Sequence, residues 1–542
     1  MERGEWALAD LILVNGKIYT MDGELPRATA VAIRGERVLC VGRDEEVKGL
    51  LRSGGRTVNL KGKCVLPGLI DAHLHFESFS LGMRRIDAET ESVEELLERV
   101  RERVAELETG SWILGFGWNQ NVWGGVFPTK EMLDGVAPEH PVFLRAKSGH
   151  AGWANAAAMR IAGVDRSTED MDGGALVRDG EGEPTGIFLE DAQGLIGAHI
   201  PEPSQEEAVA AMEEGQERAL EQGLAGVHDL DGARALKGWQ ILRERGEMRL
   251  RVCKSVPGQL LEQALAVGIR SGLGDEWLRI GGVKLFADGA LGPRTAWMIE
   301  PYEGEEERGI ATADMEELRG MVRRASAGGL ASFVHAVGDR ANREILDIFA
   351  AVRKEERARG EGHLRHRIEH AQLLHADDWS RLAELKVIGS MQPIHATSDM
   401  EIVDRHWGDR GEGAYHFRTL LERGTALAFG SDCPVERIAP LVGIHAAVTR
   451  RRTDGMPGEE GWYPEQRLSV EEAVHGFTLG AAFASGEEKV KGSLTRGKLA
   501  DLVVLDRDIF AIPPMEILEA RVEGTMLGGE WGFAGEGFDC GD

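Results

Sequence analysis

The chain has 542 residues, of which 42% are hydrophobic, and its formal net charge is −28. A chain of this length can bury a large core or divide into domains. An acidic surface of this kind repels phosphate backbones and anionic membranes. Composition therefore argues against nucleic acids and membranes as partners, and we interpret the charge as serving solubility.

The cysteines and the apolar segments indicate the cellular compartment. The five cysteines are odd in number, widely spaced and without a close CxxC pair, which is typical of a reduced, intracellular protein. No window reaches about 18 uninterrupted apolar residues, the length that a membrane helix requires. The sequence therefore predicts a cytoplasmic protein.

Both ends of the chain carry short strand-like runs. Asn15-Gly16 and Arg34-Gly35 are turn signals flanked by alternating apolar residues, and glycine-broken apolar runs return at 492–505 and 522–531. Chain termini often lie close together. We therefore expect 1–64 and 485–542 to form one small β-sandwich-like domain.

Between these ends, strand-like runs alternate with helix-like ones, the pattern of parallel βα units. Eight strands with crossover helices predict an α/β fold, a (β/α)₈ TIM barrel over 65–484, whose reactive groups sit at the carboxyl ends of the strands. The expected strands are 65–76, 224–229, 250–256, 280–287, 331–336, 367–371, 387–392 and 426–431.

One stretch interrupts this alternation. About 145 residues separate the first two expected strands, far more than an ordinary βα connection. We expect 78–222 to be a subdomain inserted after the first barrel strand, over the mouth of the barrel. The alternative is that one barrel strand lies inside it and the strand register is wrong by one.

The first barrel strand ends in the sequence VLPGLIDAHLHFE, which contains His73 and His75. Because side chains alternate along a strand, both imidazoles would face the same side and could bind one ion. A lone His-x-His pair also occurs by chance, so the residues at later strand ends decide the interpretation.

Polar residues close the later strands as well. Lys284 is either an ordinary charged lysine or a neutral amine that takes up CO₂ to form a carbamate. His335 and His370 end successive strand-like runs and could be ligands or core residues. Asp432 follows the last strand, as an oxygen ligand, a general base or a turn cap.

The order His-x-His, Lys, His, His, Asp, with strand-rich termini, resembles the amidohydrolase superfamily, and PGLIDAHLH resembles its first-strand signature. Stretches such as GWNQNVWGGVFPTKEMLD, KLFADGALGPRTA and RIEHAQ resemble the long branch that includes N-substituted formamide deformylases. The resemblance covers nearly the whole chain. It implies two divalent ions, held by His73, His75 and Asp432 and by His335 and His370, with a carbamate on Lys284 as the bridge.

The resemblance also implies a reaction. A metal-activated hydroxide would attack a carbonyl while Asp432, the catalytic residue, moves the proton to the leaving nitrogen. Zinc is the default metal, with manganese, iron or nickel open, and a single ion with unmodified Lys284 is an alternative. Superfamily habit favours a homodimer, although the acidic charge allows a monomer as readily.

The predicted function is hydrolysis of a non-peptide C–N bond in a small-molecule amide or N-formyl compound with an apolar substituent. Cyclic-amide hydrolysis, deamination, ester or phosphoester hydrolysis, or a silent assembly protein of the same fold, are the alternatives. The candidate substrate-binding residues, for each of which a structural role is equally open, are Trp118, His150, Glu190, His228, Asp288, Arg294 and His395.

Overall fold

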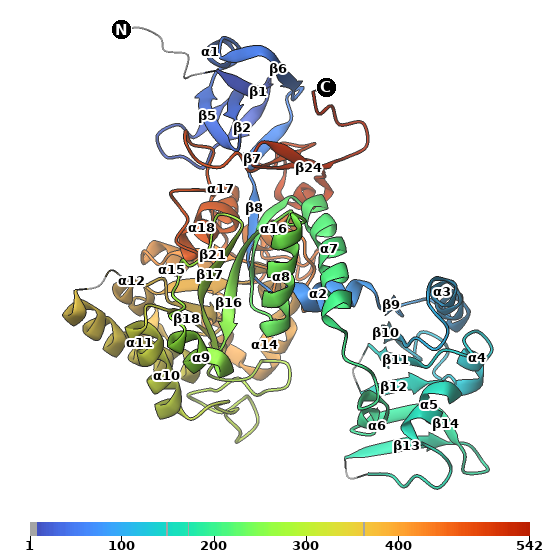
Figure 1. Cartoon of the computed structure of the whole chain (residues 1–542). Helices are drawn as coiled ribbons and strands as arrows, with labels where there is room; N and C mark the ends of the chain where they lie inside the picture. Colours follow the sequence, from blue (N-terminus) through green and yellow to red (C-terminus); the bar gives the residue numbers. More distant parts are fainter. Residues whose placement is uncertain (1–7, 148–149, 172, 361, 363, 542) are drawn as a thin grey trace. The chain divides into compact units, whose positions relative to one another are not determined.

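The computed structural model describes residues 8–147, 150–171, 173–360, 362 and 364–541 (Figure 1). The chain forms two compact units, residues 1–79 with 212–542 and residues 80–211. It passes from one unit to the other in α2 (Phe76–Met83) and returns in α7 (Gln205–Glu221). Residues 1–7 and 542, which the predicted terminal domain includes, lie outside the described residues.

Eight parallel strands form one nearly closed sheet in the first unit, which confirms the predicted barrel. Most of their residues are buried, as expected for parallel strands covered on both faces. All eight lie where the sequence predicts barrel strands, so the alternative with a shifted register is wrong. In sheet order they are β21 (Leu427–Phe429), β20 (Ile388–Met391), β19 (Arg367–His370), β18 (Ala331–Ala336), β17 (Leu278–Phe286), β16 (Arg251–Pro257), β15 (Leu224–Asp229) and β8 (Leu69–Leu74).

Helices connect these strands and follow the last of them, and local signals set the ends of the helices. The Asp314 side chain accepts hydrogen bonds from the backbone of Glu316 and Glu317 at the start of α10, while α8 and α11 end at glycines with left-handed backbone, Gly246 and Gly360. These helices are α8 (Ala233–Arg245), α9 (Leu261–Ala266), α10 (Met315–Ala327), α11 (Asp339–Arg359), α12 (Arg381–Leu385), α13 (Pro393–Ser398), α14 (Met400–His406), α15 (Phe417–Glu422), α16 (Pro440–Thr449), α17 (Val470–His475) and α18 (Ala481–Ala484).

The prediction of one strand over 65–76 is wrong in detail, because the segment forms two strands in different sheets. β7 (Cys64–Pro67) pairs with terminal strands, β8 belongs to the barrel, and Gly68 lies between them. A Cβ atom on Gly68 would lie 2.4 Å from the Cβ of Ala225, so a larger residue would clash where the chain crosses. His73 is therefore on β8, and His75 follows its end.

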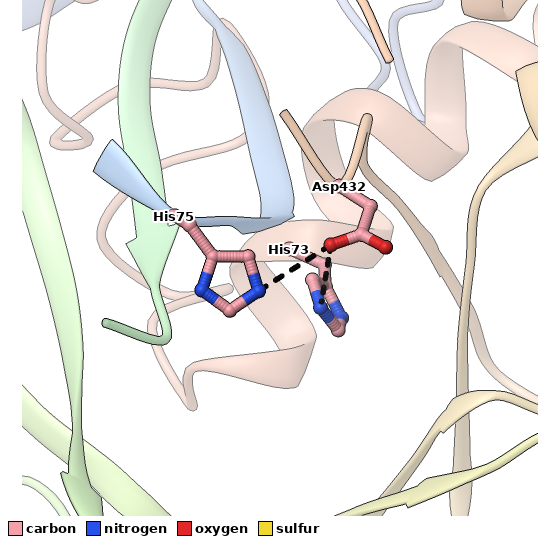
Figure 2. A group of neighbouring side chains, drawn as sticks. All are labelled: His73, His75 and Asp432. Atoms are coloured by element: carbon pink, nitrogen blue, oxygen red, sulfur yellow. Dashed lines mark ion pairs between the residues drawn. The ribbon is translucent and has the colours of Figure 1, made fainter. Parts of the chain in front are cut away.

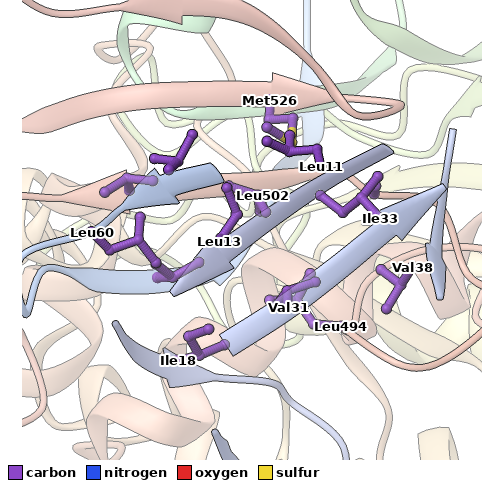
Figure 3. Close-up of a cluster of buried hydrophobic side chains, with 14 residues drawn as sticks. Leu11, Leu13, Ile18, Val31, Ile33, Val38, Leu60, Leu494, Leu502 and Met526 are labelled. Carbon is purple, nitrogen blue, oxygen red and sulfur yellow. The ribbon is translucent and has the colours of Figure 1, made fainter. Parts of the chain in front are cut away.

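Both ends of the chain contribute to the terminal β domain, as predicted. Its core packs Leu11 and Ile33 of one sheet against Leu502 and Met526 of the other (Figure 3). The four-stranded sheet contains β5 (Arg37–Gly42), β4 (Ala30–Arg34), β1 (Ala9–Val14) and β6 (Leu51–Asn59), with α1 (Asp44–Lys48) beside it. The six-stranded sheet contains β24 (Glu530–Ala534), β23 (Val522–Leu527), β22 (Leu502–Leu505), β7, β2 (Lys17–Tyr19) and β3 (Arg27–Ala28).

The second unit has its own sheet and core. Trp118 and Trp153 pack there with Leu144 and Ile113. The sheet order is β13 (Gly174–Arg178), β14 (Pro184–Glu190), β12 (Ala151–Ala154), β11 (Val142–Ala146), β10 (Ile113–Trp118) and β9 (Ile86–Asp87), and the helices are α3 (Val93–Glu106), α4 (Lys130–Asp134), α5 (Ala156–Ala162) and α6 (Gln193–Gly197). The unit is the predicted insertion after the first barrel strand. Its place over the barrel mouth and the domain boundaries stay predictions.

None of the helices in the described part of the chain combines the length and the apolarity that crossing a membrane requires.

Candidate metal centre

Two histidines and an aspartate converge at the carboxyl end of the barrel strands, and we call them the first donor group (Figure 2). The Nε2 atom of His73 lies 3.3 Å from Oδ1 of Asp432, and that of His75 lies 3.4 Å from the same oxygen. Ligands at 2.0–2.1 Å from a tetrahedral zinc ion would be about 3.3 Å apart. The spacing of the three donor atoms therefore fits a single divalent cation.

Backbone hydrogen bonds hold this group together across the seam of the barrel. The amide of Asp432 donates to the carbonyl of His73 at 2.7 Å, and the amide of His75 donates to the carbonyl of Cys433 at 2.8 Å. Asp432 has a left-handed backbone, with φ at 59°. The residues after β21 thus run along the end of β8, which brings a carboxylate to the two imidazoles.

A buried aspartate and a glycine make this close approach possible. Asp71 accepts hydrogen bonds from the backbone of His73 and Ser431, at 3.1 and 3.0 Å. A Cβ atom on Gly430 would lie 2.5 Å from both the Asp71 carboxylate and the His73 nitrogen. Only glycine lets the two segments meet here.

A carboxylate lies beside the Nδ1 atom of each histidine of the first donor group. His73 Nδ1 lies 2.7 Å from Oε2 of Glu369, and His75 Nδ1 lies 3.2 Å from Oδ1 of Asp231. Because Nδ1–H donates to the carboxylate, the neutral form of each ring carries its lone pair on Nε2. The Nε2 of His73 is buried and makes no hydrogen bond to any described residue, as expected of an atom that binds a cation.

The charges of the neighbours shift the pKa values of these groups. Burial opposes a charge on His75, but the Asp231 and Asp432 carboxylates outweigh it and raise the pKa of His75 to about 9. Burial also opposes a charge on Glu369, but Arg367, at 3.1 Å, and His73 hold the pKa of its carboxyl well below the usual range. The group behind His73 is therefore a charged carboxylate.

A second donor group shares Asp432 and contains His370 and His395. Oδ2 of Asp432 lies 3.9 Å from His395 Nε2, and His370 Nδ1 lies 2.9 Å from Oε1 of Gln392. His370 has a φ of 72°, which interrupts the side-chain alternation of β19. Glu369 and His370 consequently both lie against His73, although they are consecutive residues.

Lys284 and His335 lie beside this group. Lys284 is 4% exposed, and burial lowers its pKa to about 8 although the Glu369 and Asp432 charges oppose the shift. The centroids of the His335 and His370 rings lie 4.5 Å apart. The Nε2–H of His335 donates to the Gly289 carbonyl at 2.9 Å, which leaves the lone pair of this ring on Nδ1. The structure thus brings all six predicted ligands to one end of the barrel.

Comparison with known proteins identifies the family of the chain. A model of the amidohydrolase family matches residues 56–531. The chain belongs to the amidohydrolase family. It is 36% identical to Protein LONG AFTER FAR-RED 3 of Arabidopsis thaliana, over 96% of this chain and 91% of that protein, and 29% identical to the N-substituted formamide deformylase of Arthrobacter pascens, over 96% and 98%.

A solved structure supports the same family. An uncharacterized metal-dependent hydrolase of Pyrococcus furiosus matches with a TM-score of 0.77 and 32% identity, over 92% of this chain and 99% of that chain. Family membership makes this chain a metal-dependent hydrolase, and the roles of its individual residues stay proposals.

Three of the predicted substrate-binding residues of this amidohydrolase lie in the barrel unit with structural partners. His228 is fully buried and accepts a hydrogen bond at Nδ1 from Arg367 at 2.9 Å. Asp288 accepts backbone hydrogen bonds from the loops after β17 and β18, and burial raises its pKa to about 7. Arg294 pairs with Glu305. These contacts favour structural roles, and any contact with a substrate stays a prediction.

Three further candidates lie in the unit of 80–211. Trp118 is fully buried, and its indole N–H donates to the Leu144 carbonyl at 2.8 Å, which favours a packing role. His150 and Glu190 are exposed, and His150 Nδ1 lies 2.9 Å from Oε2 of Glu190. A role for this pair in substrate binding stays a prediction.

Sequence reasoning missed the groups behind the histidines. Glu369, Asp231 and Gln392 are all polar residues at strand ends, the signal that identified the ligands themselves. Near Asp231, the sequence pattern favoured His228, beside Asp229, as the candidate and not Asp231. In the structure, Asp229 accepts a hydrogen bond from the Trp239 indole and does not orient His75.

Proposed function

We propose that this protein hydrolyses a non-peptide C–N bond in a small molecule, an amide or N-formyl compound with an apolar substituent. The observation that carries the proposal is the approach of His73 Nε2 and His75 Nε2 to one oxygen of Asp432, at 3.3 and 3.4 Å. The similarity to an N-substituted formamide deformylase over nearly the whole chain supports the choice of bond.

In this proposal His73, His75 and Asp432 hold one divalent ion, and His335 and His370 hold a second. Imidazole and carboxylate donors suit zinc. A carbamate on Lys284 would bridge the two. The lysine is buried, and in the described part of the chain no carboxylate forms an ion pair with its Nζ. Because an unpaired buried ammonium is costly, conversion to a carbamate bound between cations would remove that cost.

Bound ions of this kind polarise a carbonyl oxygen and make water nucleophilic near neutral pH. The residues of the chain provide orientation and proton transfer. Asp432 accepts the proton that the attacking water loses as the new C–O bond forms, and it delivers this proton to the nitrogen as the C–N bond breaks. Glu369 and Asp231 keep the rings of His73 and His75 in the tautomer that presents Nε2.

The intact set of donor residues argues against a silent assembly protein. Six residues from the ends of five strands lie close together, and carboxylates or an amide orient three of the histidines. Buried polar groups of this kind destabilise a fold unless they are satisfied, so a protein without a metal would have no reason to collect them.

Metal analysis of the purified protein, together with mass spectrometry of the Lys284 peptide under conditions that preserve carbamates, is the first test. We expect close to two ions per chain and a mass increase that corresponds to CO₂. The metal-loaded protein is then assayed against a panel of N-substituted formamides, amides, esters and phosphoesters, with the chelator-treated protein as the control.

Metal-dependent release of an amine from a formamide or amide would support the proposal. Hydrolysis of esters or phosphoesters alone would contradict the choice of bond, and a protein that binds no ion after reloading would contradict the mechanism. The homodimer also stays a prediction, which light scattering during size-exclusion chromatography measures directly.

A further inference from the structure

His395 is a buried histidine close to the donor residues. The ligand set that the family resemblance implies does not include it. His395 lies in the first turn of α13 and is 8% exposed. Its Nε2 atom makes no hydrogen bond to any residue that the structure describes, and it lies 3.9 Å from Oδ2 of Asp432. A buried imidazole nitrogen without a partner is costly, which points to a ligand at this position.

One short segment both supplies His395 and orients His370. Gln392 follows the last residue of β20 and precedes Pro393, which starts α13, and the His395 amide donates to the Gln392 carbonyl at 3.1 Å. The Gln392 side chain accepts the Nδ1–H of His370 at 2.9 Å, which leaves the lone pair of that ring on Nε2. The His370 and His395 rings are nearly parallel, with centroids 6.1 Å apart.

These contacts leave two imidazoles and one carboxylate oxygen facing one another. The donor atoms of His370, His395 and Asp432 all lie within 4.8 Å of one another, and all three residues are buried. The two carboxylate oxygens of Asp432 face different histidines: Oδ1 lies toward His73 and His75, and Oδ2 lies toward His395. Two nitrogens and one oxygen are a donor set that suits zinc and similar divalent ions.

We propose that His395 is a ligand of the second divalent ion, which it binds together with His370 and Asp432. This inference rests on the proposed function, because both require a metal-loaded centre. It adds a residue from α13, the helix after the seventh barrel strand, to His335 and His370 at the second ion, and Asp432 would contact both ions in addition to the proposed carbamate.

The test compares full-length wild-type protein with His395→Gln and His395→Asn. Each protein is stripped with a chelator and titrated with Co²⁺, with visible absorption reporting the binding of each ion, and Zn²⁺ content is measured after reloading. His445→Gln is the matched control, because His445 is likewise a buried histidine with one ring nitrogen, Nδ1, that makes no hydrogen bond to a described residue, but it belongs to neither donor group. Circular dichroism shows whether each variant is folded.

We expect two ions per chain in wild type and in His445→Gln, and one in the His395 variants. Partners that only orient a ligand contribute about 10- to 100-fold to metal affinity, so the loss of a direct ligand should weaken the second ion by more than about 100-fold. Folded His395 variants that bind two ions with wild-type affinity would overturn the inference and assign His395 to the substrate side.

The number of bound ions distinguishes the role of His395 from the proposed function. A wild-type protein that binds one ion and loses nothing on His395 substitution would overturn this inference but leave a mononuclear version of the proposed function. A wild-type protein that binds no ion after reloading would overturn the proposed function and this inference together.

Discussion

The two donor groups share Asp432 but differ in the side chains that accept hydrogen bonds from the Nδ1 atoms of their histidines. In the first, the charged carboxylates of Glu369 and Asp231 accept hydrogen bonds from His73 and His75. In the second, the neutral amide of Gln392 accepts the hydrogen bond from His370. The donor atoms are also closer in the first group, 3.3 and 3.4 Å against 3.9 Å.

This difference predicts unequal affinity for metal. A carboxylate behind an imidazole raises the basicity of the ligand and fixes its orientation, whereas an amide provides orientation with less charge. We therefore expect the first group to bind its ion more tightly and the second ion to be lost first when a chelator is added. Four substitutions test this comparison.

The largest effect is expected from Asp432→Asn, because this carboxylate belongs to both groups. The amide keeps an oxygen for coordination but cannot carry the proton, so metal binding should remain in part while kcat falls by about 10³-fold or more. Steady-state kinetics and metal analysis measure the two effects. Glu436→Gln, four residues further along, is the control, and a substantial rate retained in Asp432→Asn would refute the role of Asp432.

Glu369→Gln should come next, because it removes the charge behind His73. We expect affinity for the first ion to fall by about 10- to 100-fold in competition with a chelator. Arg367 would lose its buried counter-charge, so the metal-free protein should also lose about 3–5 kcal/mol of stability in denaturant unfolding. Glu487→Gln, which breaks another buried ion pair, should lose stability without losing metal affinity. Equal metal affinity in the two variants would contradict the comparison.

Asp231→Asn should have a smaller effect on the same ion. The hydrogen bond to His75 is longer, at 3.2 Å, and His75 is partly exposed, so we expect an affinity loss of about tenfold. Isothermal titration calorimetry measures it directly. Asp378→Asn is the matched control, since this buried aspartate pairs with Arg343 and Arg381 and contacts neither donor group, and a similar loss in both variants would mean that the effect is not specific to His75.

Gln392→Glu should have the smallest effect and the opposite sign. It places a carboxylate behind His370 and makes the second group like the first, so affinity for the second ion should rise by up to about tenfold. The Co²⁺ titration resolves this step. Gln466→Glu adds the same charge at a buried position bonded to Thr419 and should leave both ions unchanged. A second ion that binds more weakly in Gln392→Glu would show that the amide is the better partner.

The sequence alone was sufficient to place the eight barrel strands and the polar residues that end them. Apolar runs of strand length, separated by helical periodicity, determine where a parallel barrel can form. His73, His75, Lys284, His335, His370 and Asp432 follow such runs, so their meeting at one end is a consequence of the topology.

Only the tertiary structure decided which side chains accept hydrogen bonds from the histidine ligands. Glu369 of β19 hydrogen-bonds His73 of β8 although β20 and β21 lie between these strands in the barrel, and the left-handed backbone of His370 interrupts the alternation of side chains beside it. Gly68 likewise divides an apparently continuous strand between two sheets. A sequence pattern shows which residues are neighbours along one strand. The partners of a ligand come from other strands, and the approach of those strands depends on backbone conformations that composition and periodicity do not encode.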